Sequence, residues 1–282
     1  MVAVVEISEG PGTGAAYAKA ALGLIPGLRK GDSLPDVELV HRGVTVDLGH
    51  LARYDRVCGF RLGGVLPATY PHILAFPLAM RLMSAGDFPL PMIGLVHVSN
   101  RITVHEPVDA GTPLDLSVRA VDLREHPRGR QFDVIATATV SGREVWRGVS
   151  TYLRKETSGY SPRHQQADPP PPGGAVWRLP VRTGPDYAAV SGDRNPIHTS
   201  KLGAKLFGFP KPIAHGMWTK ARCLAALEGR LPEAYTVDVA FKQPITLPST
   251  VRFLATPTGT GWDFTVNGKK PHLTGSIGNP PA

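Results

Sequence analysis

Four consecutive prolines, Pro169–Pro172, stand next to Gly173 and Gly174 at the end of a polar stretch that begins at Ser158. Proline fixes φ and has no amide hydrogen, so this run cannot lie inside a helix or a central strand and favours an extended connector. A chain of 282 residues is long enough for two domains. We therefore expect an N-terminal unit over 1–157, a linker over 158–174 and a C-terminal unit over 175–282.

The two halves share one order of predicted elements, a helix followed by a run of strands. Turn signals separate the last two strands of each half, Ser141-Gly142 in the first and Asn267-Gly268, a type I′ signal, in the second. This order favours an α+β fold in which an antiparallel sheet curls around its own helix. The predicted helices are 74–85 and 217–227, and the predicted strands are 95–104, 114–121, 132–140, 144–153, 236–241, 250–255, 262–266 and 273–277.

The register of the two halves supports an internal duplication. At an offset of 143 residues four identities align, Pro67 with Pro210, His72 with His215, Gly86 with Gly229 and Pro89 with Pro232. Upstream, Tyr54-x-x-Val57-Cys58-Gly59 resembles Tyr187-x-x-Val190-Ser191-Gly192 at an offset of 133. The difference predicts a ten-residue deletion in the first half between these two motifs.

Composition narrows the class of protein. Hydrophobic residues make up 42%, which supports a sizeable core, and no apolar run approaches the ~20 residues of a membrane span. The start of the chain lacks the basic region of a secretory signal, and Cys58 and Cys223 form no disulfide or zinc pattern. The net charge is +8, but no Lys/Arg run exceeds two residues, so we expect no nucleic-acid partner. A cytoplasmic protein is the default expectation.

The segment 187–217, YAAVSGDRNPIHTSKLGAKLFGFPKPIAHGM, contains the residues with the most chemistry. Asp193 and His198 lie five apart, and Asn195-Pro196 between them forces an extended or turn conformation. We therefore expect both side chains on one tight loop, followed by a short helix that Ser200 caps and that ends at Gly208. Taken singly, Asp193 and Asn195 could equally be turn formers, and His198 could be a structural histidine.

His215-Gly216 stands immediately before the Ala-rich predicted helix. A glycine at a helix N-terminus exposes backbone N–H groups, where the helix dipole favours a developing negative charge. The alternative explanation of Gly216 is close packing of the loop on the helix.

The segment 187–217 resembles the signature of the MaoC-like dehydratases and R-specific enoyl-CoA hydratases in two places, SGDRNPIH and GFPKPIAHGM. The resemblance implies a double hot-dog fold, and the chain is most similar to the family's mycobacterial (3R)-hydroxyacyl-thioester dehydratases. It implies a hydro-lyase of fatty-acid metabolism that interconverts (3R)-hydroxyacyl and trans-2-enoyl thioesters. It also implies that Asp193 and His198 are the catalytic pair and that the backbone N–H of Gly216 faces the thioester carbonyl. Residues that would support this site are Tyr187, Ser191, Asn195 and His215.

On this basis His198 would take the α-proton and Asp193 would serve the β-oxygen during dehydration, with neither metal nor cofactor. The carrier would be coenzyme A or an acyl carrier protein, whose anionic groups suit a cluster of cations between Thr199 and Arg230. A non-catalytic thioester-binding subunit and a hot-dog thioesterase remain alternatives, and the chain could be a monomer or a homodimer. The candidate carrier-binding residues are Lys201, Lys205, Lys211, Lys220 and Arg222.

The first half departs from the motif, because Phe60 stands where the second half has Asp193, and the deletion removes any NPxH equivalent. We therefore expect one active site per chain. The first half would then either shape a pocket for the acyl chain or be a degenerate structural unit.

Overall fold

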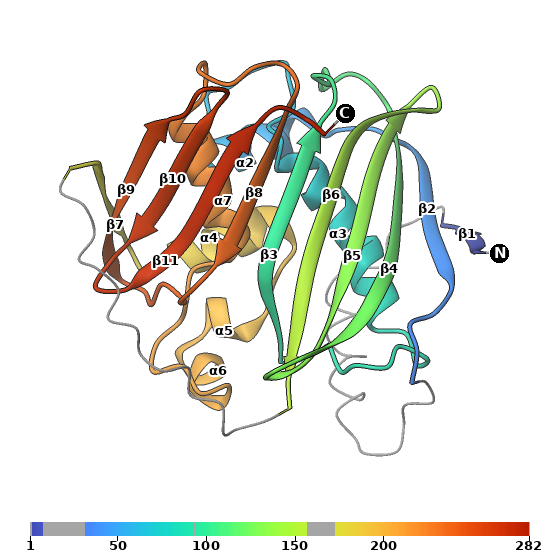
Figure 1. Ribbon diagram of the computed structural model, residues 1–282, viewed down its shortest axis with the longest axis horizontal. Coiled ribbons are helices and arrows are strands. Elements are labelled where there is room, and N and C mark those ends of the chain that lie inside the picture. Colours follow the sequence, from blue (N-terminus) through green and yellow to red (C-terminus); the bar gives the residue numbers. More distant parts are fainter. Residues whose placement is uncertain (1, 8–31, 93, 157–172, 282) are drawn as a thin grey trace. The chain divides into compact units, whose positions relative to one another are not determined.

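The computed structural model describes residues 2–7, 32–92, 94–156 and 173–281, which form two compact units (Figure 1). Unit 1 comprises the described parts of Met1–Leu48 and Gly64–Tyr160, and unit 2 those of Gly49–Gly63 and Ser161–Ala282. Gly49–Gly63 thus groups with the second unit although it precedes most of the first in sequence. The predicted linker lies outside the described residues except for Gly173 and Gly174.

Unit 1 is built on a sheet in the order β1-β2-β4-β5-β6-β3, antiparallel except where β1 pairs with β2. Buried residues alternate along β4, as a sheet with one covered face requires. The predicted turn between β5 and β6 is confirmed, since Ser141 and Gly142 both have positive φ, 51° and 78°. The strands are β1 (Ala3–Glu6), β2 (Val37–Val44), β3 (Leu95–Val104), β4 (Leu114–His126), β5 (Gly129–Val140) and β6 (Arg143–Lys155).

Helix α3 (Tyr70–Met83) packs against β4 and β5 on the covered face of this sheet (Figure 1). It begins four residues before the predicted start at 74, because Pro71 lies in the first turn, where no amide hydrogen is needed. Its 14 residues are apolar on most sides. None of the helices in the described ranges combines the length and the apolar character that a membrane crossing requires.

Unit 2 contains a second antiparallel sheet, in the order β8-β11-β10-β9-β7, together with helix α7 (Gly216–Ala226). Lys220 of α7 donates a hydrogen bond from Nζ to the backbone oxygen of Val237 on β8, 3.1 Å away. Tyr235, Val237 and Val239 alternate as buried residues along β8. The strands are β7 (Ala175–Leu179), β8 (Tyr235–Phe241), β9 (Ser249–Pro257), β10 (Trp262–Asn267) and β11 (Pro271–Gly278).

Sequence reasoning missed the elements that precede the long helix of each half. They include β2 and α2 (Leu48–Cys58) in the first half, and β7 and α4 (Thr183–Ser191) in the second. The paired motifs Tyr-x-x-Val end α2 and α4, and the glycines that follow, Gly59 and Gly192, both have left-handed backbones with φ of 84° and 72°. The duplication therefore includes a second helix in each half.

The predicted type I′ turn at Asn267-Gly268 is wrong. A type I′ turn needs positive φ at both central residues, and neither residue is among those with positive φ. Asn267 is instead the last residue of β10, and the connection to β11 runs from Gly268 to Lys270, closed by a hydrogen bond from the Gly268 amide to the Lys270 oxygen. The hairpin itself is present, but its loop is longer than predicted.

Candidate active site

Helix α4 delivers the chain to Asp193 through a left-handed glycine. Gly192 caps α4 with φ 72°, a conformation that glycine adopts without strain. The chain therefore turns at Gly192, and the amide of Asp193 donates a hydrogen bond back to Ser191 Oγ, 3.2 Å away. Ser191 is buried, whereas the Asp193 side chain keeps 27% exposure. The turn thus presents the Asp193 carboxylate at the edge of the protein interior.

Asn195 organises the next turn. Its side chain caps α5 (Pro196–Thr199) by accepting a hydrogen bond from the amide of Ile197, and its own amide donates to Asp193 Oδ1 at 3.2 Å. Pro196 fills the first position of the helix, where a missing amide hydrogen costs nothing. The turn thus holds Asp193 directly before α5. His198 is the third residue of this one-turn helix and not, as the spacing predicts, a loop residue.

His198 is held by a backbone carbonyl. Its Nδ1 lies 2.8 Å from the oxygen of Ile213, and because a carbonyl only accepts, Nδ1 carries the proton. Burial lowers the pKa of His198 below 6.5, partly opposed by the negative charge of Asp193. The ring is therefore neutral at pH 7, with its free lone pair on Nε2.

His215 stacks directly on this ring. The two ring centroids are 3.6 Å apart, and the planes are inclined by 25°. His215 Nε2 donates a hydrogen bond to the backbone oxygen of Asp193 at 3.0 Å, so His215 ties α7 to the catalytic loop. Burial, aided by the neighbouring His198, lowers the pKa of His215 to about 3. Both stacked imidazoles are therefore uncharged.

Asp193, His198 and His215 also have the composition of a metal site, with one potential ligand atom from each within 4.8 Å of the others. Imidazole lone pairs lie in the ring plane, so two stacked rings direct them into separate, nearly parallel planes. One nitrogen of each ring donates to a backbone carbonyl, as in many metal-bound histidines, so only the stacking of the rings argues against a shared cation. The arrangement fits an acid and a base acting side by side better than a cation bound by both rings.

Gly216 is the first residue of α7, so its amide has no acceptor within the helix. A Cβ at this position would lie 2.9–3.1 Å from three ring atoms of Phe241 on β8. Glycine therefore lets the helix start pack closely on that ring. This agrees with the packing explanation of Gly216 and leaves its amide available at the helix N-terminus.

Tyr187 of α4 connects the catalytic loop with the segment contributed by the first half. Its ring centroid lies 4.9 Å from that of His215 and 6.3 Å from that of Tyr54 on α2, the matching tyrosine of the repeat. Phe60, which replaces the acid in the first half, lies against Tyr54 with nearly parallel rings. Within unit 2, the degenerate motif therefore contributes aromatic packing beside the intact one.

The predicted carrier-binding cations separate into different environments. Lys201, Lys205 and Lys211 are exposed, and Arg222 is half-buried with its guanidinium 5.3 Å over the ring of Trp177. Lys220 has no exposed surface, and burial lowers its pKa well below 10.5. Because its Nζ bonds to a strand carbonyl inside unit 2, the expectation that Lys220 contacts a carrier is wrong.

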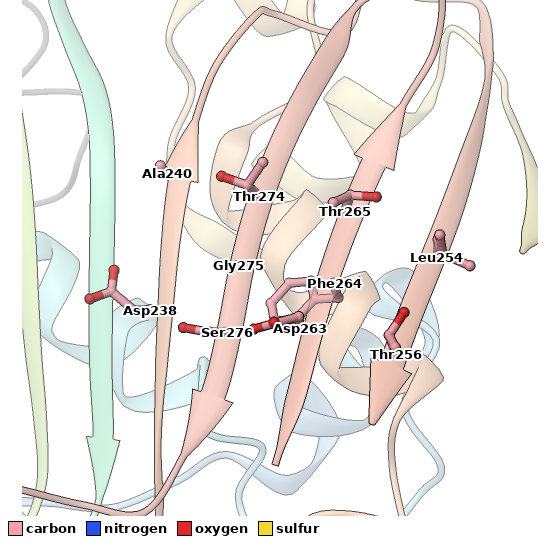
Figure 2. A pocket seen from close by; sticks show the side chains of 10 residues that line it. All are labelled: Asp238, Ala240, Leu254, Thr256, Asp263, Phe264, Thr265, Thr274, Gly275 and Ser276. Carbon is pink, nitrogen blue, oxygen red and sulfur yellow. The ribbon is translucent and has the colours of Figure 1, made fainter. Parts of the chain in front are cut away.

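A hollow on the outer face of the unit 2 sheet contains none of the predicted site residues. Figure 2 shows Asp238, Ser276 and Asp263 in it, and these three residues are paired in one row across β8, β11 and β10. Two carboxylates in an open depression would repel a phosphate-bearing carrier. This hollow is therefore unsuited to the anionic thioester carriers that the sequence predicts.

Two residues that shape the site escaped sequence reasoning. Ile213 supplies the carbonyl that fixes the tautomer of His198, and Phe241 supplies the ring against which Gly216 packs. Ile213 lies inside the motif, but its side chain gives no signal because only its backbone acts. Phe241 lies at the end of a predicted strand, and nothing in its local sequence distinguishes it.

Comparison with known proteins places this geometry in context. The family model "MaoC like domain" matches residues 183–273, which include the whole catalytic loop and α7. The chain is 38% identical over 266 residues to 3-hydroxyacyl-thioester dehydratase X of Mycobacterium tuberculosis, covering 92% of this chain and 95% of that protein.

Solved structures agree with this relationship. The crystal structure of HtdX of Mycobacterium tuberculosis superimposes with a TM-score of 0.77 at 38% identity, over 85% of this chain and 98% of that one. Another protein of the same bacterium, described as having a double hot-dog fold, matches with a TM-score of 0.54 at 13% identity, over 84% of this chain and 93% of that one. The predicted double hot-dog fold is confirmed.

Proposed function

The chain belongs to the MaoC-like dehydratase family, and from this premise we propose that it interconverts (3R)-hydroxyacyl thioesters and trans-2-enoyl thioesters by removing or adding water. The observation that supports this most is the meeting of a carboxylate, Asp193, with a buried neutral imidazole, His198, on one loop. Dehydration of a 3-hydroxyacyl thioester needs a base that takes the α-proton and an acid that protonates the β-hydroxyl. The relative from Mycobacterium tuberculosis is named a 3-hydroxyacyl-thioester dehydratase, which agrees with this reaction.

In this proposal His198 is the base during dehydration. Its Nδ1 proton is committed to the Ile213 carbonyl, so Nε2 is the atom that can accept the α-proton. The lowered pKa keeps Nε2 unprotonated at neutral pH, and the positive charge formed by proton transfer is balanced by nearby Asp193. The electron pair of the broken Cα–H bond forms the new Cα=Cβ bond.

Asp193 acts as the acid in the same step. Its protonated carboxyl gives a proton to the β-hydroxyl as the Cβ–O bond breaks, and the hydroxyl leaves as water. The proton gained by His198 then returns to Asp193, whose oxygen lies within 4.8 Å of the imidazole ligand atom. Hydration is the reverse reaction. The Asp193 carboxylate takes a proton from the attacking water, and protonated His198 gives its proton to the α-carbon.

The thioester carbonyl needs a hydrogen-bond donor, because removing the α-proton moves negative charge onto its oxygen. We assign this role to the amide of Gly216, which begins α7 at the positive end of the helix dipole. His215 supports the assignment, since it precedes Gly216 directly and also bonds the backbone of Asp193. Donor and acid are thereby held by one side chain.

We also propose that unit 1 provides space for the acyl chain. Small residues face each other across a narrow interior space between α3 and its sheet, with Ala75 and Ala79 on the helix and Ala136 and Gly148 on the strands. The polar side chains of His72, Ser150 and Tyr152 also line this space, and its volume is only about 10 Å³, so its walls would have to move apart to admit a hydrocarbon tail. The degenerate first half, with Phe60 in place of an acid, then serves binding rather than proton transfer.

The proposal includes an anionic carrier and a cytoplasmic location. Exposed Lys201, Lys205 and Lys211 follow the catalytic loop and could meet the phosphates of coenzyme A or the acidic surface of an acyl carrier protein. Cys58 and Cys223 are buried and unpaired, as is usual where thiols stay reduced.

One assay separates this function from its alternatives. The purified chain is mixed with crotonyl-coenzyme A while enoyl absorbance and free thiol are followed together. We expect the absorbance to fall without thiol release, and chiral chromatography to identify the (3R) product. Thiol release would instead indicate a thioesterase. Binding of the thioester with neither change would indicate a non-catalytic subunit.

A further inference from the structure

Helix α6 (Lys201–Leu206) presents its apolar side chains to solvent and its small residues to the interior. Leu202 and Leu206, one helical turn apart, are 69% and 75% exposed, and the adjoining Phe207 is 39% exposed. The residues that face inward are Gly203 and Ala204, of which Ala204 is completely buried. An ordinary surface helix has the opposite arrangement, with leucines inside.

Lysines flank these apolar side chains. Lys201 and Lys205 lie on the same short helix, and Lys211 follows in the loop; all three are exposed, and none forms an ion pair with a residue in the described ranges. The sequence contains no Asp or Glu between Arg194 and Lys220. We call Lys201, Leu202, Lys205, Leu206, Phe207 and Lys211 the α6 patch.

The α6 patch is joined rigidly to the catalytic loop. Ser200 ends α5, which contains His198, and its side chain caps α6 by accepting from the amide of Gly203 at 3.2 Å. Gly203 in turn packs so closely on Pro196 that any side chain at this position would collide with it. In the view of Figure 1, α5 and α6 lie beyond the ends of β8–β11. A partner bound to α6 is thus one helix away from the proposed base.

We propose that the α6 patch docks an acidic protein carrier, so that the physiological substrate is an acyl carrier protein thioester; this rests on the proposed function. Coenzyme A presents phosphates, which the lysines alone can bind, so its binding does not require the exposed leucines. A carrier protein with an acidic amphipathic helix complements both halves of the patch, its apolar side chains on the leucines and its carboxylates on the lysines. Both carriers match the charge of the patch, and the exposed leucines favour the protein over the nucleotide.

The test compares one acyl group on two carriers. Crotonyl-acyl carrier protein from the same host and crotonyl-coenzyme A are hydrated by the wild type and by the single variants Leu206→Ser and Lys205→Glu. We expect both variants to lower kcat/KM at least tenfold on the protein carrier. Leu206→Ser, which removes only an apolar contact, should lower it less than threefold on coenzyme A. The matched controls are Leu62→Ser, at a residue 69% exposed like Leu202, and Lys269→Glu at another exposed lysine; neither should change either substrate.

Equal losses from Leu206→Ser on both carriers, or no loss on either, would overturn the docking proposal while leaving the dehydratase proposal intact. A wild type inactive on both substrates would instead contradict the proposed function itself. Two further measurements cover other occupants of the patch, namely sedimentation with phosphatidylglycerol vesicles and analytical ultracentrifugation. If Leu206→Ser abolished vesicle binding or self-association while leaving carrier kinetics unchanged, the patch would belong to a membrane or to a second copy.

Discussion

The imidazole rings of His198 and His215 are stacked with their centroids 3.6 Å apart, and each ring donates one hydrogen bond to a backbone carbonyl of the other's segment. His198 bonds to Ile213, which lies two residues before His215, and His215 bonds to Asp193, five residues before His198. The two bonds cross-link the segment 193–198 to the start of α7. Asp193, His198 and the N-terminus of α7 therefore form one rigid group.

The first prediction concerns the acid and the base. Asp193→Asn and His198→Gln should each lower kcat by about two to four orders of magnitude, the usual range for the loss of general acid–base help. Folding should survive, because the hydrogen bonds that shape the loop come largely from Asn195, Ser191 and the backbone. Turnover is measured with crotonyl-coenzyme A, and circular dichroism checks the fold. A well-folded variant with a wild-type rate would remove that residue from the proposed mechanism.

The second prediction follows from the buried neutral state of His215. Its folded pKa of about 3 lies below the ordinary 6.5, so between these values the unfolded chain binds a proton that the folded chain does not. The free energy of unfolding therefore falls as the pH falls below 6.5, by about 1.4 kcal/mol per pH unit from this group. His198 adds in the same direction.

His215→Phe keeps a flat ring against His198 but cannot bind a proton. At pH 7.5 it should be less stable than the wild type, because the bond to the Asp193 carbonyl is lost. This difference should shrink by about 1.4 kcal/mol at pH 5.5, as the wild type alone loses the contribution of His215. Urea denaturation at the two pH values measures it. A difference independent of pH would show that His215 binds its proton equally well in the folded and the unfolded chain.

The third prediction concerns Asp55 on α2. This carboxyl is 2% exposed, its Oδ1 has no hydrogen-bond partner among the described residues, and burial together with the charge of Glu228 raises its pKa to about 6. Between pH 3.8 and 6 the folded chain binds a proton that the unfolded chain releases, so Asp55 lowers stability as the pH rises through this window.

Asp55→Asn removes this pH-dependent penalty. Relative to the wild type, the variant should gain up to about 3 kcal/mol in unfolding free energy between pH 4 and pH 7. Glu228→Gln is the matched variant, and it should recover only part of that gain because burial remains. Parallel stability curves for Asp55→Asn and the wild type would mean that the carboxyl is solvated or paired.

The sequence predicts well those elements that local patterns of residues determine. The predicted strand 236–241 locates β8 to within one residue of its observed start. Asn195-Pro196 correctly predicts a turn after Asp193, but His198 lies in the short helix α5 that follows and not on the turn itself. Helix α2 was missed although Leu51, Tyr54 and Cys58 are buried at helical spacing along it. Its tertiary contacts could not be predicted, as when Trp218 of α7 donates from Nε1 to the Val57 oxygen at 3.1 Å. A partner 161 residues away leaves no local signal.

The fine geometry of the site was unpredictable for the same reason. The Ile213 carbonyl is positioned by a bridge between Ile213 and Thr246, and by bonds that pair the neighbouring residues of these two segments. Burial of Lys220 depends on where α7 faces β8, which a basic residue in an Ala-rich helix does not reveal. Tertiary contacts thus fix the tautomer of His198 and the place of Lys220.

The last prediction tests whether unit 1 receives the acyl chain. Ala79 on α3 and Ala136 on β5 line the narrow interior space, and both are nearly fully buried. A larger side chain there would occupy volume that a long acyl chain needs but that a four-carbon chain does not reach. Ala79→Val should therefore reduce kcat/KM for dodecenoyl-coenzyme A at least tenfold more than for crotonyl-coenzyme A.

The control must separate lost space from general damage to the core. Ala120 on β4 is as buried as Ala79, 7% exposed in both cases, but it does not line the space. Ala120→Val adds the same two methyl groups and should affect all chain lengths equally, through stability alone. If Ala79→Val also lowered activity equally on both substrates, the first half would be a structural unit, and the acyl chain would have to bind elsewhere.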